Sequence, residues 1–403
     1  MSNKAVVFKG EKQVAIESFD DPKLEMPDGR AAPHGAIIKL LGTNICGSDQ
    51  HMTRARTAAK PGLRLGHEAT GIIEEVGSAV EGLKKGDIIT VPFNIACGTC
   101  SSCKKGLTNL CVRANEGGFG AAYGYVALGW DNHGVQAEYA FIPWVMTNSR
   151  VIPNTDEAKA KMVDMCMLSD IFPTGFAGAV RSGVGPGKSV YVAGCGPVGL
   201  AALESCRILG AGPIFAADKI SARLKQAATI DRVIPIDIST ADETPIAEQV
   251  RKVTGSPYVD CFIDAVGFEA SGHGAQSSSE HAATVLNAGF DLLGVGGMLS
   301  APGLYVPEDP GGKGDAAKGI LGVAIGLGWA KACGLCTGQT AVLQWNDLLM
   351  NSILFGGANI AKAVNAEIIS LDEAPRGYSE FDDGKSVKYV IDPHGELSKM
   401  VAA

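Results

Sequence analysis

Side chains that can bind a metal ion and move a proton gather in one early part of the chain, at Cys46, Ser48, Asp49, His51 and His67. A cysteine thiolate and a neutral imidazole suit zinc, and a catalytic zinc keeps three protein ligands and one open position. Ser48 and His51 are the hydroxyl and imidazole that a proton relay needs. Asp49 can orient a ligating histidine. Taken alone, Cys46 and His67 fit a buried free cysteine and an unrelated histidine better, and a third ligand must come from elsewhere.

A second metal site is predicted by four cysteines with the spacing C-x2-C-x2-C-x7-C, namely Cys97, Cys100, Cys103 and Cys111. Four thiolates this close in sequence can surround one ion, and a four-cysteine set without an open position is the structural type of zinc site. An iron–sulfur cluster is the main alternative, since it also uses four cysteines. Disulfide bonds are disfavoured because a cytosolic chain keeps its thiols reduced.

A dinucleotide site is predicted by residues 188–202, which form a strand, a tight turn and a helix around G-x-G-x-x-G. The glycines permit the turn, let a pyrophosphate approach the backbone and let the helix pack on the strand. The residues expected at the phosphates are Gly194, Gly196, Pro197, Val198 and Gly199. Asp218 ends the next apolar strand, where its charge fits the ribose of NAD and repels the 2′-phosphate of NADP. Arg223 is expected to stack on the adenine or, less favourably, to recruit a phosphate.

The hydrophobic patterning around these motifs predicts two kinds of structure. Short strands with polar turns predict an all-β region, with strands expected at 5–8, 13–16, 36–40, 68–76 and 87–91. From Lys188 onward, apolar strands alternate with helices, which predicts a parallel sheet with helices on both faces. A helical stretch at 342–354 and a terminal strand at 387–391 follow. The glycine-rich string at 117–124 is interpreted as a loop.

Composition excludes several classes of protein. The chain has 403 residues and a net charge of -8, with no basic run, which argues against a nucleic-acid surface. No uncharged stretch reaches the ~18 residues that a membrane helix needs. Lys9 and Lys12 interrupt any apolar signal segment, so a cytoplasmic protein is expected. Eleven cysteines in such a chain indicate metal binding or catalysis.

Together and in this order, the motifs resemble the zinc-containing medium-chain alcohol dehydrogenases over nearly the whole chain. The strings at 43–52, 168–175, 259–269 and 389–394 are similar to the glutathione-independent formaldehyde dehydrogenases and formaldehyde dismutases. The resemblance implies an α/β chain with two domains. The first is a GroES-like, β-rich catalytic domain of residues 1–168 and 341–403, with a structural-zinc lobe at about 95–113. The second is a Rossmann domain, a doubly wound parallel sheet that binds NAD, at 169–340.

The resemblance also supplies the third ligand of the catalytic zinc. Many alcohol dehydrogenases have a cysteine four residues before a threonine that touches the nicotinamide, and here Asp170 stands four residues before Thr174. The implied ligands are therefore Cys46, His67 and Asp170. Cys166 is the alternative third ligand, and Asp170 has a second interpretation as a helix N-cap. Glu68 is implied to lie behind the zinc and to exchange with a ligand, although an ordinary charged residue at a strand start is an equal alternative.

The implied reaction is the oxidation of formaldehyde hydrate, and of other small aldehydes and alcohols, by hydride transfer to NAD. Ser48 would accept the substrate proton, the cofactor ribose and His51 would pass it to solvent, and Thr174 would help to position the nicotinamide. The implied assembly is a homotetramer with two zinc ions per chain. Three alternatives to this function stay open. The protein could dismutate formaldehyde through tightly bound NAD, or it could be an ordinary alcohol or polyol dehydrogenase that releases NADH. A non-catalytic nucleotide-binding protein is the less favoured third alternative.

The segment 267–281, rich in Gly, Ser and His, is predicted to be a lid. It follows an apolar strand at 261–266, whose carboxyl end should face the cofactor crevice of a parallel sheet. The resemblance implies that the segment covers the adenine end of NAD and slows its escape. A mobile surface loop is the alternative that its composition favours.

Overall fold

A parallel sheet of six strands forms one half of the molecule in the computed structural model, which describes residues 2–402. Its spatial order is β10-β9-β8-β11-β12-β13, and every neighbouring pair is parallel. The strands are β8 (Val190–Ala193), β9 (Ile214–Asp218), β10 (Val233–Asp237), β11 (Val259–Asp264), β12 (Leu293–Ala301) and β13 (Gly334–Thr337). The order reverses between β8 and β11, and ligands of such sheets bind outside the carboxyl ends of the strands at this point.

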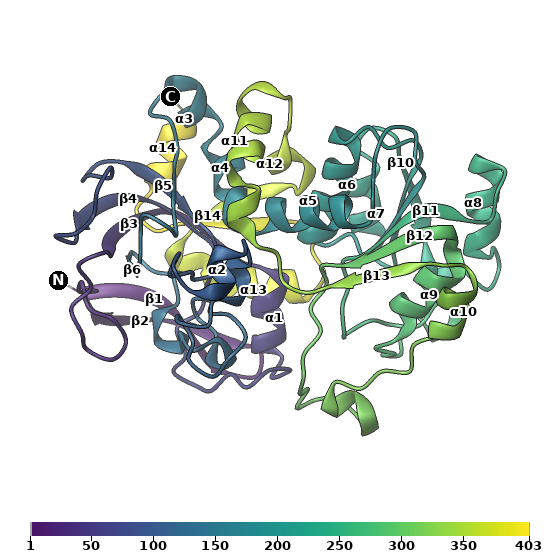
Figure 1. The fold of residues 1–403 in the computed structure, drawn as a ribbon, viewed down its shortest axis with the longest axis horizontal. Helices are drawn as coiled ribbons and strands as arrows, with labels where there is room; N and C mark the ends of the chain where they lie inside the picture. Colours follow the sequence, from purple (N-terminus) through teal and green to yellow (C-terminus); the bar gives the residue numbers. More distant parts are fainter. Residues whose placement is uncertain (1, 403) are drawn as a thin grey trace.

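Helices cover both faces of this sheet because successive strand residues point to opposite sides. Val190 and Val192 of β8 pack into the same hydrophobic cluster as Leu200 of α6 (Pro197–Ile208). Tyr191, between them in sequence, faces the other way and stacks on Phe262, with ring centroids 5.1 Å apart. Figure 1 shows α5 (Ile171–Arg181) and α6 on one side of the sheet and α9 (Thr284–Leu292) and α10 (Ile325–Ala330) on the other. The predicted doubly wound sheet is therefore confirmed.

The other half of the molecule is β-rich and uses both ends of the described chain (Figure 1). Six strands follow the order β14-β15-β3-β4-β5-β7, and β6 also pairs with β3. They are β3 (Ala36–Asn44), β4 (Ala69–Val76), β5 (Ile88–Val91), β6 (Tyr139–Ile142), β7 (Arg150–Val151), β14 (Ala366–Ser370) and β15 (Lys388–Asp392). β1 (Ser2–Gly10) and β2 (Gln13–Asp20) form a separate antiparallel pair. The key connection is β15 to β3, which joins late and early sequence in one sheet.

The strands predicted in the N-terminal region are all present, and the string at 117–124 contains no helix. The predicted helical stretch at 342–354 is interrupted. It contains a short 3-10 turn, Val342–Gln344, and then α11 (Asn346–Phe355). The strand at 387–391 is present as β15, but it is not terminal, because α14 (Glu396–Ala402) follows it. β14 was not predicted, since its sequence Ala-Glu-Ile-Ile-Ser is short and mixed.

The remaining helices connect these strands. They are α1 (Gly47–Thr53), α2 (Ser101–Lys104), α3 (Asp156–Ala160), α4 (Met162–Cys166), α7 (Ser221–Ala227), α8 (Ile246–Thr254), α12 (Ile360–Ala363) and α13 (Ala374–Asp382). No helix in residues 2–402 is long and apolar enough to cross a membrane. The parallel sheet lies wholly within 169–340, and the β-rich sheet takes strands from both sides of that range. This arrangement supports, as a proposal, domains of residues 1–168 with 341–403 and of residues 169–340.

Candidate metal and dinucleotide sites

Four buried side chains, those of Cys46, His67, Glu68 and Asp170, place ligand atoms within 4.8 Å of one another. Asp170 Oδ2 lies 3.2 Å from His67 Nε2 and 3.6 Å from Cys46 Sγ. Ser48 Oγ lies 3.3 Å from the same His67 Nε2. A thiolate, an imidazole and a carboxylate converging in this way are the donor types that zinc takes.

Local backbone structure brings the first two of these side chains together. Cys46 is the residue before α1, and its backbone N–H donates to Asp49 Oδ2 over 2.9 Å. Gly66 precedes His67 with a φ of +98° and packs so tightly on Gln136 that a Cβ would lie 2.4 Å from its side chain. A larger residue at 66 would therefore clash with Gln136 and strain the backbone immediately before His67. Asp49 Oδ1 lies 3.3 Å from His67 Nδ1, where it can receive the proton of that nitrogen once Nε2 binds a metal.

Asp170 is held by its neighbour on the following helix. Thr174 Oγ1 donates a 2.7 Å hydrogen bond to Asp170 Oδ1, which leaves Oδ2 facing Cys46 and His67. Asp170 occupies the N-cap position of α5, but its side chain makes no capping hydrogen bond. The structure therefore favours the ligand interpretation of Asp170 over the capping one. Cys166, the alternative third ligand, is buried outside the cluster.

The electrostatics of the cluster fit a cation. Burial opposes a charge on His67, but Tyr125 and the carboxylates of Asp49 and Asp170 raise its pKa well above the usual value. Burial raises the pKa of the Cys46 thiol, Lys388 opposes this rise, and Asp170 adds to it. Asp49 Oδ1 and His67 Nδ1 are both buried, and neither atom makes a hydrogen bond. A divalent ion would supply the missing positive charge, keep Cys46 as thiolate and fix the proton of His67 on Nδ1.

Glu68 is occupied by a partner that the sequence motifs did not indicate. Its carboxylate forms a buried ion pair with Lys388 Nζ on β15 and accepts a 2.6 Å hydrogen bond from Asn44 Nδ2. Both charged side chains are fully buried. The sequence signal for this ion pair was a lysine within the otherwise apolar string 387–391, since a buried lysine needs an acidic partner. The exchange of Glu68 with a zinc ligand stays a prediction.

The four cysteines form a second cluster, with Sγ atoms within 4.8 Å of one another. Cys100 Sγ lies 3.5 Å from Cys103 Sγ and 3.9 Å from Cys111 Sγ, and every cysteine in residues 2–402 is free. Three backbone N–H groups, those of Cys97, Thr99 and Cys100, point at sulfur atoms of the set over 3.3 to 3.4 Å. Such donors stabilise thiolates. The set has the closed form of a structural zinc site.

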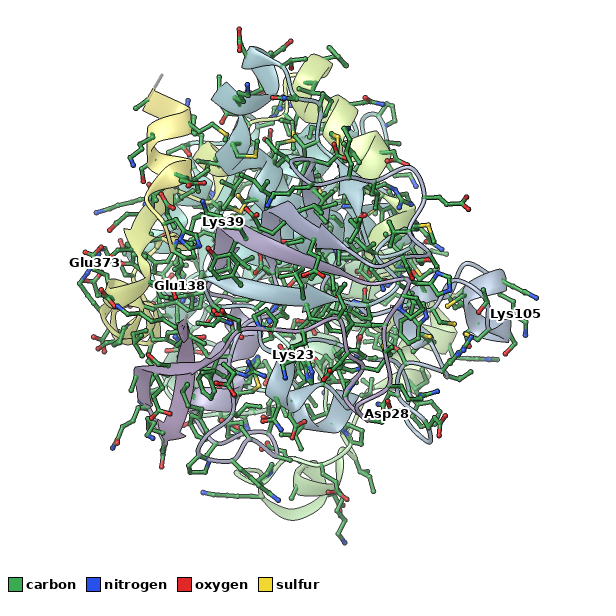
Figure 2. The ribbon with its side chains drawn as sticks, turned by 90° about the vertical axis from the view of Figure 1, so that its left-hand side faces the viewer. Lys23, Asp28, Lys39, Lys105, Glu138 and Glu373 are labelled. Carbon is green, nitrogen blue, oxygen red and sulfur yellow. The ribbon has the colours of Figure 1, made fainter. Side chains whose placement is uncertain are left out.

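This second cluster lies in a lobe at the edge of the β-rich half. Lys105, the residue after α2, projects at the margin of the molecule in Figure 2. Gly98 has a φ of +74°, and a Cβ there would lie 2.5 Å from Thr147 Oγ1. The lobe therefore folds tightly against the 140s of the chain.

The predicted dinucleotide turn has the expected backbone form between β8 and α6. Gly194 has a φ of +88°, Gly196 is the N-cap of α6 and Pro197 occupies its first turn. A Cβ on Gly199 would lie 1.8 Å from Gly194 O, so α6 can approach β8 only because this residue is glycine. Gly196 has open space where a Cβ would stand. Val198 follows Pro197 in the same helical turn. The assignment of these residues to a cofactor remains a proposal.

Asp218 ends β9 beside this turn. Its Oδ2 accepts a 2.9 Å hydrogen bond from Cys195 N and its Oδ1 one of 2.9 Å from Ile220 N. Arg223 approaches the same carboxylate at 3.9 Å. The carboxylate thus holds the glycine turn in shape while facing the cleft, as a ribose-binding acid would.

Both groups of residues line one cleft of 1170 Å³ between the two sheets. The metal-ligand side contributes Cys46, Ser48, His51, His67, Asp170 and Thr174, and the turn side contributes Gly194, Gly196, Pro197, Val198, Asp218 and Arg223. A cofactor on the glycine turn and a substrate at the metal cluster would therefore share a single cavity. Sequence motifs alone do not establish this juxtaposition.

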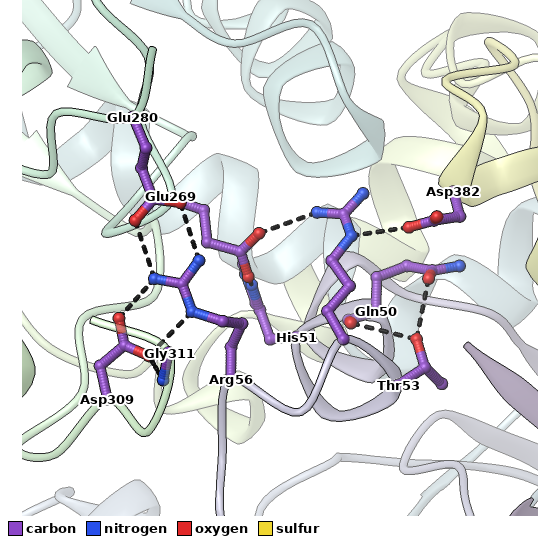
Figure 3. A network of polar contacts seen from close by, with 10 residues as sticks. Gln50, His51, Thr53, Arg56, Glu269, Glu280, Asp309, Gly311 and Asp382 are labelled. Carbon is purple, nitrogen blue, oxygen red and sulfur yellow. Dashed lines mark hydrogen bonds and ion pairs between the residues drawn. The ribbon is translucent and has the colours of Figure 1, made fainter. Parts of the chain in front are cut away.

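A charged network ties the two sides of the cleft together (Figure 3). His51 Nδ1 pairs with Glu269 Oε1, and Arg54 donates a 2.9 Å hydrogen bond to Glu269 Oε2. Arg56 binds Glu280 through two 2.8 Å hydrogen bonds and also pairs with Asp309. Glu269 and Glu280 lie near the two ends of the segment 267–281. The segment is thus anchored at both ends by residues that follow Cys46 of the metal-ligand cluster candidate, and its Ser271 and His273 line the cleft.

Comparisons with known proteins identify the family and the fold of the chain. Residues 32–153 match the alcohol dehydrogenase GroES-like domain. The chain is 50% identical to a glutathione-independent formaldehyde dehydrogenase of Bacillus subtilis over 98% of both chains. It is 40% identical to a formaldehyde dismutase of Pseudomonas putida, again over 98% of both. Among solved structures, an alcohol dehydrogenase of Thermus sp. ATN1 has a TM-score of 0.79 at 30% identity, over 96% of this chain and 99% of that one.

The fold, a GroES-like domain with a Rossmann domain, is that of the Thermus enzyme. The chain therefore belongs to the zinc-type alcohol dehydrogenase family, among the glutathione-independent formaldehyde dehydrogenases.

Proposed function

We propose that this protein oxidises formaldehyde, as its hydrate, and other small aldehydes and alcohols by hydride transfer to NAD. The observation that carries the proposal is the single cleft that holds both the Cys46–His67–Asp170 cluster and the glycine turn. The 50% identical relative, named a formaldehyde dehydrogenase, supports the substrate class. The proposed ligands are Cys46, His67 and Asp170 for a catalytic zinc and Cys97, Cys100, Cys103 and Cys111 for a structural zinc.

When bound, zinc would supply Lewis acidity toward the substrate oxygen, and NAD would supply the hydride acceptor. The protein's own side chains do the remaining work. Ser48, beside His67 Nε2, accepts the proton of a substrate hydroxyl at this position. Thr174 holds Asp170 by its hydroxyl and thereby fixes the orientation of a ligand. Tyr125 and Phe93 pack against the His67 ring and make the surroundings of the reacting hydroxyl apolar.

The test of this function is product analysis with formaldehyde alone, with and without added NAD. Formate together with free NADH would show a dehydrogenase, and equal amounts of formate and methanol would show a dismutase. Turnover of longer alcohols without any turnover of formaldehyde would instead show an ordinary alcohol or polyol dehydrogenase. Absence of any redox turnover in zinc-loaded protein would leave only the nucleotide-binding alternative.

Retention of NAD distinguishes the two formaldehyde reactions, and the anchored segment 267–281 bears on it. If this segment is a lid, NAD should copurify with the protein, so that one bound nicotinamide can oxidise one aldehyde and reduce the next. We expect Arg56→Gln to release bound NAD about 10- to 100-fold faster, because each lost hydrogen bond between charged groups is worth about 1.5–3 kcal/mol. The measurement is nicotinamide released on denaturation after gel filtration, together with stopped-flow exchange of added NAD.

Arg376→Gln is the matched control for this experiment. Arg376 lies on α13, outside the cleft, and it also pairs with several carboxylates, those of Glu367, Glu373 and Glu380. It should leave NAD release unchanged. Trace NAD in the unmodified protein, with rapid exchange, would refute the lid and favour the dehydrogenase that releases NADH each turn.

Cofactor choice is the next prediction. We expect a strong preference for NAD over NADP, because the Asp218 carboxylate would repel the 2′-phosphate. Asp218→Ala should weaken NAD binding about 10- to 100-fold through the loss of a charged hydrogen bond and should improve NADP. Asp218→Asn keeps an acceptor for Cys195 N and separates the loss of charge from a collapse of the turn. The measurement is the ratio of kcat/KM values with the two cofactors; equal use of both by the unmodified enzyme would contradict the assignment.

The cellular setting follows from the same resemblance. We propose a cytoplasmic enzyme that works as a homotetramer on small molecules, without nucleic-acid or membrane partners. Sedimentation equilibrium with metal-loaded protein measures the assembly directly.

A further inference from the structure

His51 has a partner from the opposite side of the cleft. Its Nδ1 pairs with Oε1 of Glu269, a residue of the segment that follows β11, 218 positions away. A carboxylate is only an acceptor, so the proton of this contact is on Nδ1 of His51. Within residues 2–402, His51 Nε2 has no hydrogen-bond partner, and the residue lines the cleft. In the neutral ring, Nε2 is therefore the nitrogen that can accept a proton.

Glu269 is itself fixed and charged. Both side chains of the pair are only 12% exposed. Burial opposes the charge of Glu269, but the hydrogen bond and charge of His51 and then those of Arg54 hold its pKa below the usual value. The His51 ring also packs on Phe268, with ring centroids 4.9 Å apart. Ring position and proton position are thus set by two consecutive residues of one segment.

The other charged groups around this pair form a short chain. Arg54 bridges Glu269 and Asp382, and Asp382 also binds Lys12 at 2.9 Å. The Arg56 guanidinium lies over Phe268, 5.2 Å from the ring centroid, and its own acidic partners are Glu280 and Asp309. Of these groups, Glu269 is the one in direct contact with the imidazole. Figure 3 shows it between His51 and the neighbouring arginine side chains.

We propose that Glu269 is a positioning residue for proton transfer, which holds His51 in the Nδ1–H form and stabilises its protonated state when the segment 267–281 lies on the cleft. This inference rests on the proposed function, and it assigns to that segment a part in the chemistry besides covering the cofactor. A carboxylate behind a histidine that acts as a base performs the same task in hydrolytic triads, where it orients the ring and stabilises the imidazolium.

The proton balance is simple. Ser48 and His51 are three residues apart on α1 and so lie on the same helix face. The proton released at Ser48 arrives at Nε2 of neutral His51, which becomes a cation while Nδ1–H stays on the Glu269 carboxylate. Nε2 then gives the proton to water and the neutral ring returns. Glu269 is not protonated at any point.

The test uses Glu269→Gln, which keeps the shape of the side chain and removes its charge. Without that charge, His51 stays neutral to lower pH, so the acid limb of the kcat profile should move down by about 1 pH unit, and maximal kcat should fall about 10-fold. An independent readout is the pH dependence of His51 modification by diethyl pyrocarbonate, followed by mass spectrometry of its peptide. Only a neutral imidazole reacts, so the pH midpoint of the modification should shift by the same amount as the acid limb of the kcat profile.

Glu280→Gln is the matched control, because Glu280 anchors the same segment through Arg56 without touching His51. It should leave the modification midpoint of His51 where it is in the unmodified protein. In a His51→Gln background, Glu269→Gln should add little to the loss of kcat, since the two residues act as one unit.

An unshifted modification midpoint in Glu269→Gln, or an equal shift in Glu280→Gln, would overturn the inference. The chemical modification needs no turnover. If formaldehyde proves not to be a substrate, the proposed function fails while the effect of Glu269 on His51 is still measured.

Discussion

Cys46→Ser should lower kcat by at least about 10³-fold while the protein stays folded. A bound zinc contributes several kcal/mol of transition-state stabilisation, and each 1.36 kcal/mol is tenfold in rate. Serine is close to cysteine in size, and the Cys46 backbone N–H keeps its hydrogen bond to Asp49. The measurements are kcat with formaldehyde and zinc content by elemental analysis, which should fall from two ions per chain to one.

Two matched variants separate the metal sites. Cys166→Ala removes a cysteine that is equally buried but lies outside the ligand cluster, and it should keep both zinc ions. Cys100→Ser should lose the other zinc and lower the thermal midpoint and solubility, because a structural zinc contributes folding energy. One zinc per chain in the unmodified protein, or full activity of Cys46→Ser, would contradict the proposed ligand sets.

Lys388→Met should destabilise the protein by about 3–5 kcal/mol, because breaking a buried ion pair leaves an uncompensated buried charge. Glu68, the partner, is fully buried beside Cys46 and Asp170, which are also acidic. A bound dication would offset part of this charge, so the loss should be larger in zinc-free protein than in zinc-loaded protein. The measurement is the free energy of unfolding in guanidinium chloride for both forms.

The control for this prediction is the double variant Lys388→Met, Glu68→Gln. Removing both charges should restore most of the stability lost in the single variant, since the cost comes from the unpaired carboxylate. Arg376→Gln, at an exposed ion pair on α13, should change stability by less than about 1 kcal/mol. If Lys388→Met alone lowered the free energy of unfolding by less than about 1 kcal/mol, the Lys388–Glu68 pair would not support the metal cluster.

The parts of the site that the sequence predicted are those encoded by short-range spacing. The four cysteines lie within one short segment, and the glycine turn joins one strand to the next helix, so local geometry determines both. Cys46 and Ser48 are likewise close in sequence. The parallel sheet was predictable for a similar reason, because β-α alternation repeats along the chain.

The parts that could not be predicted from the residues depend on packing between distant segments. The Lys388–Glu68 pair joins positions 320 residues apart and the His51–Glu269 pair joins positions 218 apart. Neither has a spacing pattern, since the sequence between the partners folds into other elements. Asp170 needed the family resemblance, because an aspartate before a helix is as typical of a cap as of a ligand. β14 lacked a clear alternation and was recognised only from its pairing with β15.

The pairing of β15 with β3 has a consequence for how the protein is made. Domains fold during synthesis in order from the N-terminus, at about 5–20 residues per second. The six parallel strands, at 190–337, leave the ribosome before β14 and β15, so the nucleotide-binding half can complete its sheet first. The half that holds Cys46 and His67 must wait for Lys388 to arrive on β15 and neutralise Glu68. We therefore expect metal uptake at Cys46 to be a late step of biogenesis, after the parallel sheet has formed and β15 has paired with β3.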